Sequence, residues 1–213
     1  PDDEHAQKIG YKRGKNEAWF FIESDPGASI VYGQKTKNKE ELQEMINQDK
    51  WDDIYKKYPV ADGDFVYLPA GCLHAMGKGN VVYEIQQSTD VTYRFYDYHR
   101  KDKDGNEREL HLKQAIDCLS FDKDIDKNDV HPVVKVHENM KETIFISNDS
   151  FTVSQLLVIG KCQYKCDNYQ LATVVKGSGK VDEYDVKVGD NFLIPTNTSI
   201  ELDGQMMIMM TTK

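Results

Sequence analysis

The sequence predicts a mainly β fold made of two small β-barrels, or jelly rolls, with one short helical insertion. Short β-rich segments follow one another at close spacing, with Gly, Pro, Asn and Asp between them. Apolar residues recur at helical spacing chiefly at about 38–58. A Gly-Asp turn, a short apolar strand and a proline occur in that order twice, at 63–69 and 189–195. This weak internal repeat suggests two barrels of one kind.

The first predicted domain covers residues 1–120. Its strands are β-rich segments bounded by turn residues, at 17–23, 28–33, 64–68, 80–86 and 92–97. In the insertion at about 38–58, Asn38 is a candidate N-cap, and a second short helix from Trp51 is ended by Pro59. After the last strand come a charged loop and a helix, at 99–108 and 111–119.

The second predicted domain covers residues 128–213 and follows a charged, turn-rich linker at 121–130. Its strands are expected at 133–136, 143–147, 151–159, 171–176, 180–184, 191–194, 199–202 and 206–211. The second copy of the repeat has Thr196-Asn197-Thr198 where the first copy runs on to a histidine. We therefore expect a second β-barrel that serves as a scaffold and lacks this histidine.

The run from Gly63 to His74 carries the most specific motif of the chain. Its spacing, G-x5-P-x-G-x2-H, resembles the second half of the cupin signature, in which this histidine binds a metal inside a small β-barrel. A partly buried histidine in a β core is the competing interpretation, but the full spacing favours a ligand. The fold class is therefore a double cupin.

Glu17 is the second candidate metal ligand. A carboxylate at the start of a strand is usually solvated, but beside His74 it completes a set of oxygen and nitrogen ligands suited to Zn²⁺. A catalytic zinc takes three protein ligands and keeps one position open, so at least one ligand must come from elsewhere.

Charged residues of two predicted strands could face the same barrel interior. Alternation in the strand 92–97 places Thr92, Arg94 and Tyr96 on one face, and a buried arginine would need an anion there. An outward arginine on a solvated face is the competing interpretation. The same two interpretations apply to Glu84.

Several blocks in order resemble the type I mannose-6-phosphate isomerases, in their short bacterial form. The blocks are 1–6, 14–19, 63–77, 84–98 and 108–111, and the resemblance covers residues 1–119. It implies a zinc enzyme that interconverts mannose 6-phosphate and fructose 6-phosphate. By resemblance, Glu17 and His74 are zinc ligands, and the catalytic residues are Lys15, which faces the substrate, Arg94, Glu84 and Asp90. A carboxylate such as Glu84 could act as the general base.

The resemblance also implies a further zinc ligand directly before Pro1. We therefore expect one zinc per complete site, an incomplete first barrel in this chain, and little or no activity from residues 1–213 alone. A cupin module that binds a sugar or a metal without turnover is the alternative. An iron oxygenase would need a set of several histidines that the sequence does not offer.

Composition limits the partners of the chain. The net charge of -9 and the lack of a basic stripe argue against nucleic acid, and no apolar run is long enough to cross a membrane. The acidic start is unlike a signal peptide, and the four cysteines form no C-x2-C pair. We expect a cytoplasmic protein whose partner is a small sugar phosphate, and the sequence leaves the oligomeric state open.

Overall fold

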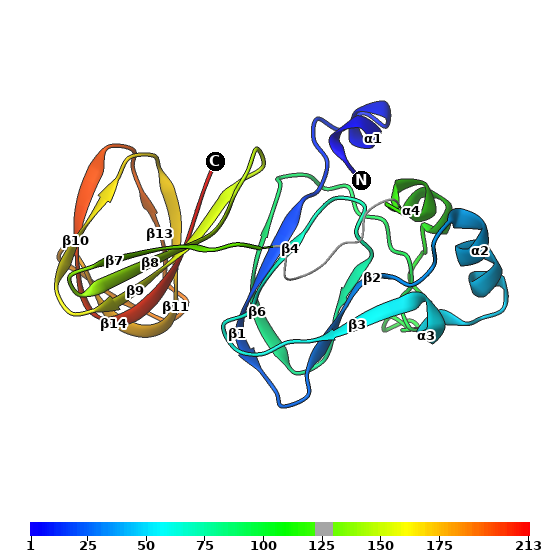
Figure 1. The fold of residues 1–213 in the computed structure, drawn as a ribbon, viewed down its shortest axis with the longest axis horizontal. Coiled ribbons are helices and arrows are strands. Elements are labelled where there is room, and N and C mark those ends of the chain that lie inside the picture. Colours follow the sequence, from blue (N-terminus) through cyan, green and yellow to red (C-terminus); the bar gives the residue numbers. More distant parts are fainter. Residues whose placement is uncertain (122–129) are drawn as a thin grey trace.

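The computed structural model describes residues 1–121 and 130–213, which form two β-rich halves lying side by side (Figure 1). The N-terminal half contains α1 (Asp3–Lys8), β1 (Glu17–Ser24), β2 (Ser29–Gln34), α2 (Lys39–Asn47), α3 (Trp51–Ile54), β3 (Tyr55–Pro59), β4 (Phe65–Leu68), β5 (His74–Met76), β6 (Asn80–Gln86) and α4 (Leu112–Cys118). The C-terminal half contains β7 (Val133–His137), β8 (Met140–Ser147), β9 (Thr152–Ile159), β10 (Cys162–Cys166), β11 (Gln170–Val181), β12 (Tyr184–Lys187), β13 (Asn191–Ile194) and β14 (Thr198–Thr212). The prediction of a mainly β fold is confirmed, whereas most of the predicted linker lies outside the described residues.

Two three-stranded antiparallel sheets form the N-terminal half, with strand orders β4-β1-β6 and β3-β2-β5. One cluster of buried side chains joins the two sheets and includes Trp19, Phe21, Ile30 and Val66. Among the described residues no strand of one sheet pairs with a strand of the other. Within the described residues this half is therefore a sandwich of two separate sheets.

Strand β1 is buried on both of its faces. Trp19 and Phe21 join the cluster between the two sheets, while Ala18 and Phe20 alternate with them and pack into a cluster shared with the C-terminal half. In that shared cluster the ring of Phe145 packs against Phe20, and Phe65 stacks on Phe145 with ring centroids 4.6 Å apart. Packing from both sides fixes the position of β1 and of the residues at its start.

The helical insertion is shorter than predicted. Asn38 caps α2 by accepting a hydrogen bond from the backbone N–H of Glu41, as expected, but α3 ends at Ile54. Residues 55–59 form β3, so the prediction that Pro59 ends a helix is wrong. The backbone of Tyr55 is extended, and β3 pairs with β2 at the edge of its sheet, where the missing N–H of a proline costs little. None of the helices in the described ranges has the length and apolar character needed to cross a bilayer.

The strand predicted at 92–97 is absent, and this segment is irregular. Its buried positions, Val91, Phe95 and Asp97, still fall at every second residue or a multiple of it, but no described strand pairs with the segment. The backbone of Arg94 exchanges hydrogen bonds with His111 in place of a neighbouring strand. The prediction of a strand at 92–97 is therefore wrong, although none of Thr92, Arg94 and Tyr96 is among the buried positions.

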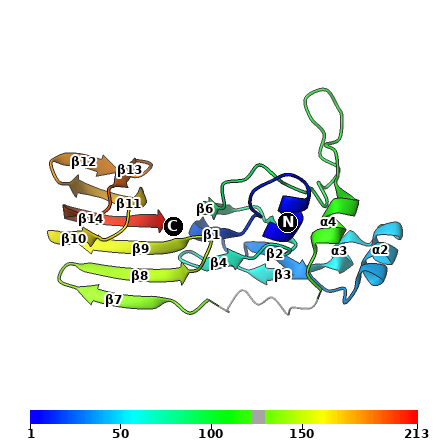
Figure 2. The ribbon, with the colours of Figure 1, turned by 90° about the horizontal axis from the view of Figure 1, so that it is seen from above.

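One curved sheet forms the C-terminal half, with strand order β12-β11-β14-β9-β8-β7, and β10 and β13 pair with β14 and β11. Figure 2 shows its strands running across this half. Four predicted strands belong to two longer ones. Strand β11 contains the predicted strand at 171–176 and extends into the one at 180–184, and β14 contains those at 199–202 and 206–211. Glycines that look like strand ends in sequence lie where two backbones cross closely, since a Cβ at Gly179 would lie 2.3 Å from the carbonyl oxygen of Asp203. Apolar side chains fill the interior of this half.

Candidate active site

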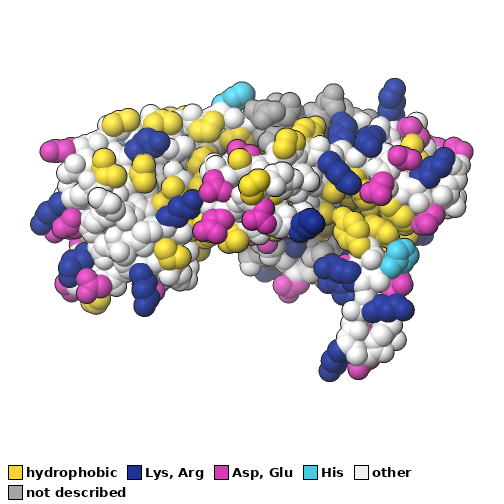
Figure 3. Space-filling view, turned by 90° about the horizontal axis from the view of Figure 1, so that it is seen from below, with side chains coloured by type: hydrophobic (Ala, Val, Ile, Leu, Met, Phe, Trp, Pro, Cys, Tyr) yellow, Lys and Arg dark blue, Asp and Glu magenta, His cyan; other side chains and the backbone are white. Residues whose placement is uncertain are grey.

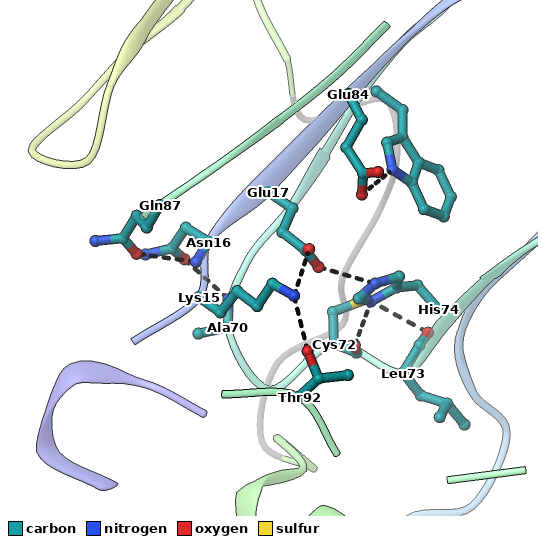
Figure 4. Close-up of polar contacts among 11 residues, drawn as sticks. Lys15, Asn16, Glu17, Ala70, Cys72, Leu73, His74, Glu84, Gln87 and Thr92 are labelled. Atoms are coloured by element: carbon teal, nitrogen blue, oxygen red, sulfur yellow. Dashed lines mark hydrogen bonds and ion pairs between the residues drawn. The ribbon is translucent and has the colours of Figure 1, made fainter. Parts of the chain in front are cut away.

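Glu17 and His74 meet although they belong to different sheets. Glu17 begins β1 and pairs with Leu68 of β4 and Gln86 of β6, whereas His74 begins β5 and pairs with Tyr32 of β2. Glu17 Oε2 lies 3.0 Å from His74 Nε2, and Glu17 is 5% exposed. The convergence expected from the sequence is thus present in the structure (Figure 4).

The ring of His74 is oriented by its own turn. Its Nδ1 lies 2.9 Å from the carbonyl oxygen of Cys72, so an Nδ1–H donates to the backbone and Nε2 faces Glu17. The ring of Trp19 packs edge-on against it, with centroids 5.4 Å apart. The turn itself needs Gly71, which has a φ of +85° and no room for a Cβ beside the carbonyl oxygen of Cys118. Metal-binding histidines use the same pattern, with one nitrogen donating to a carbonyl and the other free for the metal.

The contact between the two side chains shifts both of their pKa values. Burial would raise the pKa of Glu17, but its hydrogen bond to His74 and the positive charges of His74 and Lys15 outweigh burial and lower it. Burial would lower the pKa of His74, but the hydrogen bond and charge of Glu17 outweigh burial and raise it. The pair therefore favours a carboxylate facing an imidazolium when nothing lies between them.

Lys15 adds a second positive charge to the Glu17 carboxylate. Lys15 Nζ lies 3.5 Å from Glu17 Oε1 and donates to the hydroxyl of Thr92 at 3.0 Å. Figure 4 shows the ammonium group between these two partners. Thr92 belongs to the irregular segment that we had predicted to be a strand, and its hydrogen bond with Lys15 was not predicted.

Arg94 lies on the same segment and is half-buried. Its guanidinium Nη1 donates to the carbonyl oxygen of Glu109 at 2.9 Å. Its backbone N–H donates to His111 Nδ1, and the backbone N–H of His111 donates back to the carbonyl of Arg94. Three contacts to residues 109–111 thus hold Arg94 in place without a strand.

Glu84 and Asp90 lie farther from the centre of the site. Glu84 is on β6 opposite Trp19, and its carboxylate accepts a hydrogen bond from Trp19 Nε1 at 3.0 Å. Its charge contributes to raising the pKa of His74. Asp90 is exposed and follows β6. Neither carboxylate lines the cavity that contains Glu17 and His74.

That cavity has a volume of about 390 Å³, and Lys15, Glu17, His74 and Arg94 all line it. The cavity is also lined by Pro1, by Tyr55 and by a group of charged residues of the hairpin that residues 97–108 form after the irregular segment. Figure 3 shows hydrophobic side chains gathered at the base of this hairpin, which projects from the N-terminal half.

The charged group consists of Asp97, Arg100 and Arg108. Asp97 is buried and accepts hydrogen bonds from both guanidinium groups. The hydrogen bonds from Arg108, and next those from Arg100, hold the pKa of Asp97 far below its usual range. Sequence reasoning did not single out these residues, because their pairing depends on the return of the hairpin, which closes through one bridge between Lys101 and Glu107.

Glu17 and His74 fit a metal centre in part. They offer one carboxylate and one imidazole nitrogen side by side, which suit a divalent ion such as zinc. Within residues 1–121 and 130–213 no group of three or more His, Cys, Asp or Glu side chains is placed to hold a metal. The four cysteines, including Cys162 and Cys166 on β10, are free thiols.

Comparison with known proteins identifies the family. The chain is 37% identical to mannose-6-phosphate isomerase of Streptococcus mutans over 215 residues, which cover 98% of this chain and 67% of the relative. It belongs to the mannose-6-phosphate isomerase family. The family description "Mannose-6-phosphate isomerase, cupin domain" matches residues 141–213. A further relative, mannose-6-phosphate isomerase ManA of Bacillus subtilis, is 36% identical over 92% of this chain and 63% of its own length.

Solved structures agree with the family and the cupin fold. The crystal structure of the mannose 6-phosphate isomerase from Bacillus subtilis superposes with a TM-score of 0.93 at 30% identity, covering 100% of this chain and 69% of that chain. A putative mannosephosphate isomerase from Archaeoglobus fulgidus has a TM-score of 0.74 at 17% identity, which shows a shared fold. The chain therefore spans about two thirds of the length of the relatives that it matches.

Proposed function

We propose that this protein is an aldose–ketose isomerase that interconverts mannose 6-phosphate and fructose 6-phosphate. The observation that carries the proposal is the contact between Glu17 and His74 on the wall of a cavity, in a chain whose relatives are named mannose-6-phosphate isomerases. Because the chain spans about two thirds of the length of these relatives, we propose the activity for the whole protein. The free cysteines support a cytoplasmic location, where thiols stay reduced.

Zinc is the proposed metal, with one ion in each site. Glu17 and His74 would hold it together with at least one further ligand, since a catalytic zinc takes three protein ligands. Pro1 lines the same cavity, so a side chain of a residue joined to Pro1 would be within reach of the site. A bound divalent ion supplies Lewis-acid polarisation of the sugar oxygens at C1 and C2 without a redox step.

The residues of the chain would bind the sugar and move its proton. The isomerisation transfers a proton between C1 and C2 through an enediolate, whose negative charge needs nearby cations. Lys15 and Arg94 line the cavity and can donate to the enediolate oxygens or to the phosphate. Glu84 is the proposed general base, and Asp90 is proposed to contact the sugar from the exposed side.

The experiment is an assay of fructose 6-phosphate formation from mannose 6-phosphate by the protein as encoded. We expect conversion that stops after treatment with a chelator and returns on adding zinc. Glu17→Ala and His74→Ala should abolish it, whereas Glu138→Ala and His137→Ala, two exposed residues of the same types in the C-terminal half, should not. Sugar-phosphate binding by folded, zinc-loaded protein without conversion would overturn the isomerase proposal in favour of a binding module.

A further inference from the structure

Asn16 lies directly before β1, between the charged site residues Lys15 and Glu17, and each of its polar groups makes a hydrogen bond. Its backbone N–H and its side-chain Nδ2 both donate to Gln87 Oε1, at 2.9 and 2.8 Å. Its Nδ2 also donates to Ser150 Oγ at 3.1 Å, and its Oδ1 accepts the backbone N–H of Ala70 at 2.8 Å. Its carbonyl oxygen accepts the backbone N–H of Gln87 at 3.0 Å. Figure 4 shows Asn16 with Gln87 and Ala70 on the side away from His74.

Each partner of Asn16 belongs to a different part of the molecule. Ala70 lies in the turn that leads to His74, and Gln87 is a buried residue directly after β6. Ser150 belongs to the connection between β8 and β9 of the C-terminal half. The backbone N–H of Ser150 donates to Asn148 Oδ1 at 2.8 Å, so the connection is itself fixed. One amide side chain thus ties three segments together at the edge of the site.

The position of Asn16 in the chain makes these ties relevant to the site. Lys15 and Glu17 are its direct neighbours, and both approach the same cavity, while the amide of Asn16 turns to the other side. A shift of Asn16 would move the Lys15 ammonium relative to Thr92 and the Glu17 carboxylate relative to His74. Loss of the bond to Ala70 would also loosen the turn that orients His74.

We propose that Asn16 is a positioning residue of the active site and that Ser150 makes the C-terminal half part of its support. The inference rests on the isomerase function proposed above. Asn16 touches no reacting atom; it holds Lys15, Glu17 and the turn before His74 in one arrangement. Misplacement of reacting groups by about 1 Å can cost on the order of 100-fold in rate, so a lost amide contact should appear in kcat.

Three variants and one matched control test the inference in the protein as encoded. Asn16→Leu keeps the approximate size of the side chain and removes all its hydrogen bonds. Ser150→Ala removes only the bond from the C-terminal half, and Ser150→Thr restores a hydroxyl. Lys176→Ala is the control, because Lys176 pairs with Asp62 across the same two halves without contacting Asn16. The readouts are kcat, KM, the thermal midpoint, and hydrogen exchange at the Ala70 amide.

For Asn16→Leu we expect kcat to fall at least 10-fold with KM changed less than 3-fold, and exchange at the Ala70 amide to speed up at least 10-fold. For Ser150→Ala we expect a 2- to 5-fold fall in kcat, with Ser150→Thr near the wild type. Lys176→Ala should lower the thermal midpoint slightly and leave kcat and the exchange of the Ala70 amide unchanged.

Wild-type kcat in both Ser150→Ala and Asn16→Leu would overturn the inference. So would a fall in kcat of equal size in Lys176→Ala, since that result would mean a general loosening of the two halves. If Asn16→Leu fails to fold, the comparison of Ser150→Ala with Ser150→Thr decides the question. A wild-type protein without isomerase activity would defeat the proposed function instead. In that case, unchanged hydrogen exchange of the Ala70 amide in both Ser150→Ala and Asn16→Leu would separately defeat the inference.

Discussion

His74 Nε2 and Glu17 Oε2 are 3.0 Å apart because two opposed sheets bring together the first residues of β5 and β1. Neither sheet alone holds both side chains. The apolar cluster between the sheets, with Trp19 packed against both Phe21 and the His74 ring, sets the distance between them. The closeness of the two possible ligands is thus a consequence of core packing.

This geometry predicts how the pair affects metal content. If both side chains hold zinc, removing either leaves too few ligands for a catalytic site. We expect purified protein to hold about one zinc per chain, and Glu17→Ala and His74→Ala each to reduce the bound zinc at least 10-fold after dialysis. Atomic emission measures the metal, and Glu138→Ala with His137→Ala serves as the matched control. Full zinc content in both site variants would rule out this pair as the ligands.

A second prediction concerns the general base. Positioned general bases contribute roughly 10²–10⁴-fold to rate, so Glu84→Gln should lower kcat by about that factor. Gln keeps an oxygen for the hydrogen bond from Trp19 Nε1 and cannot take a proton from carbon at neutral pH. Steady-state kinetics with Glu23→Gln as control isolates the effect, since Glu23 is an exposed residue on neighbouring β1. Full turnover by Glu84→Gln would remove Glu84 from this role.

The sequence and the structure agree best where a local pattern determines the outcome. The turn before His74 and the strand at 17–23 depend on short-range features, and both were predicted. The segment containing Arg94 was not, because its backbone partner is His111, whose approach depends on the intervening hairpin. Tyr55 was assigned to a helix because Trp51, Ile54 and Tyr55 recur at helical spacing, and that spacing does not reveal the pairing of β3 with β2.

The same limit explains which site residues escaped the sequence. Thr92 holds Lys15, and Asp97 holds two arginines, through contacts between residues that no spacing rule relates. Asn16 lies in a block that resembles the family, but its role depends on Ser150 in the other half of the chain. Long-range contacts of this kind become visible only when the fold is in place.

A third prediction follows from the pairing of Asp97 with Arg108 and Arg100. The folded-state pKa of Asp97 is lowered, chiefly by Arg108, so its carboxylate stabilises the fold at pH values above the unfolded pKa of about 3.9. That stabilisation is lost as pH falls below about 4 toward the folded pKa. Asp97→Asn should therefore lower the thermal midpoint at pH 7, and its difference from the wild type should shrink as pH falls below about 4.

Thermal unfolding followed by circular dichroism at several pH values tests this prediction. Asp102→Asn in the same hairpin is the comparison, because Asp102 accepts its hydrogen bonds from residues of its own turn, Asp104 and Asn106, in place of the two arginines. A thermal midpoint of Asp97→Asn that equals the wild type at pH 7 would contradict the assigned pairing. A deficit that grows toward low pH would contradict the sign of the pKa shift.

The last prediction separates two costs of replacing glycine in the C-terminal half. Gly177 and Gly189 both have positive φ, of +75° and +93°, but a Cβ at Gly177 would lie 2.0 Å from the carbonyl oxygen of Gln205, whereas a Cβ at Gly189 meets nothing within 4 Å. Gly189→Ala should therefore cost only the backbone strain, about 1–2 kcal/mol of the free energy of unfolding. Gly177→Ala must also push β11 away from β14 and should cost on the order of 4 kcal/mol or more.

Urea denaturation of the two variants measures both costs against the wild type. The difference between them isolates the contact of the backbones, because the strain from positive φ is common to both. The close approach of β11 to β14 at such glycines is the reason given above for one long strand in place of two. A large difference between the variants would support that reason. Equal destabilisation by Gly177→Ala and Gly189→Ala would show that β11 and β14 do not approach so closely, and the explanation of the merged strands by close crossing would fail.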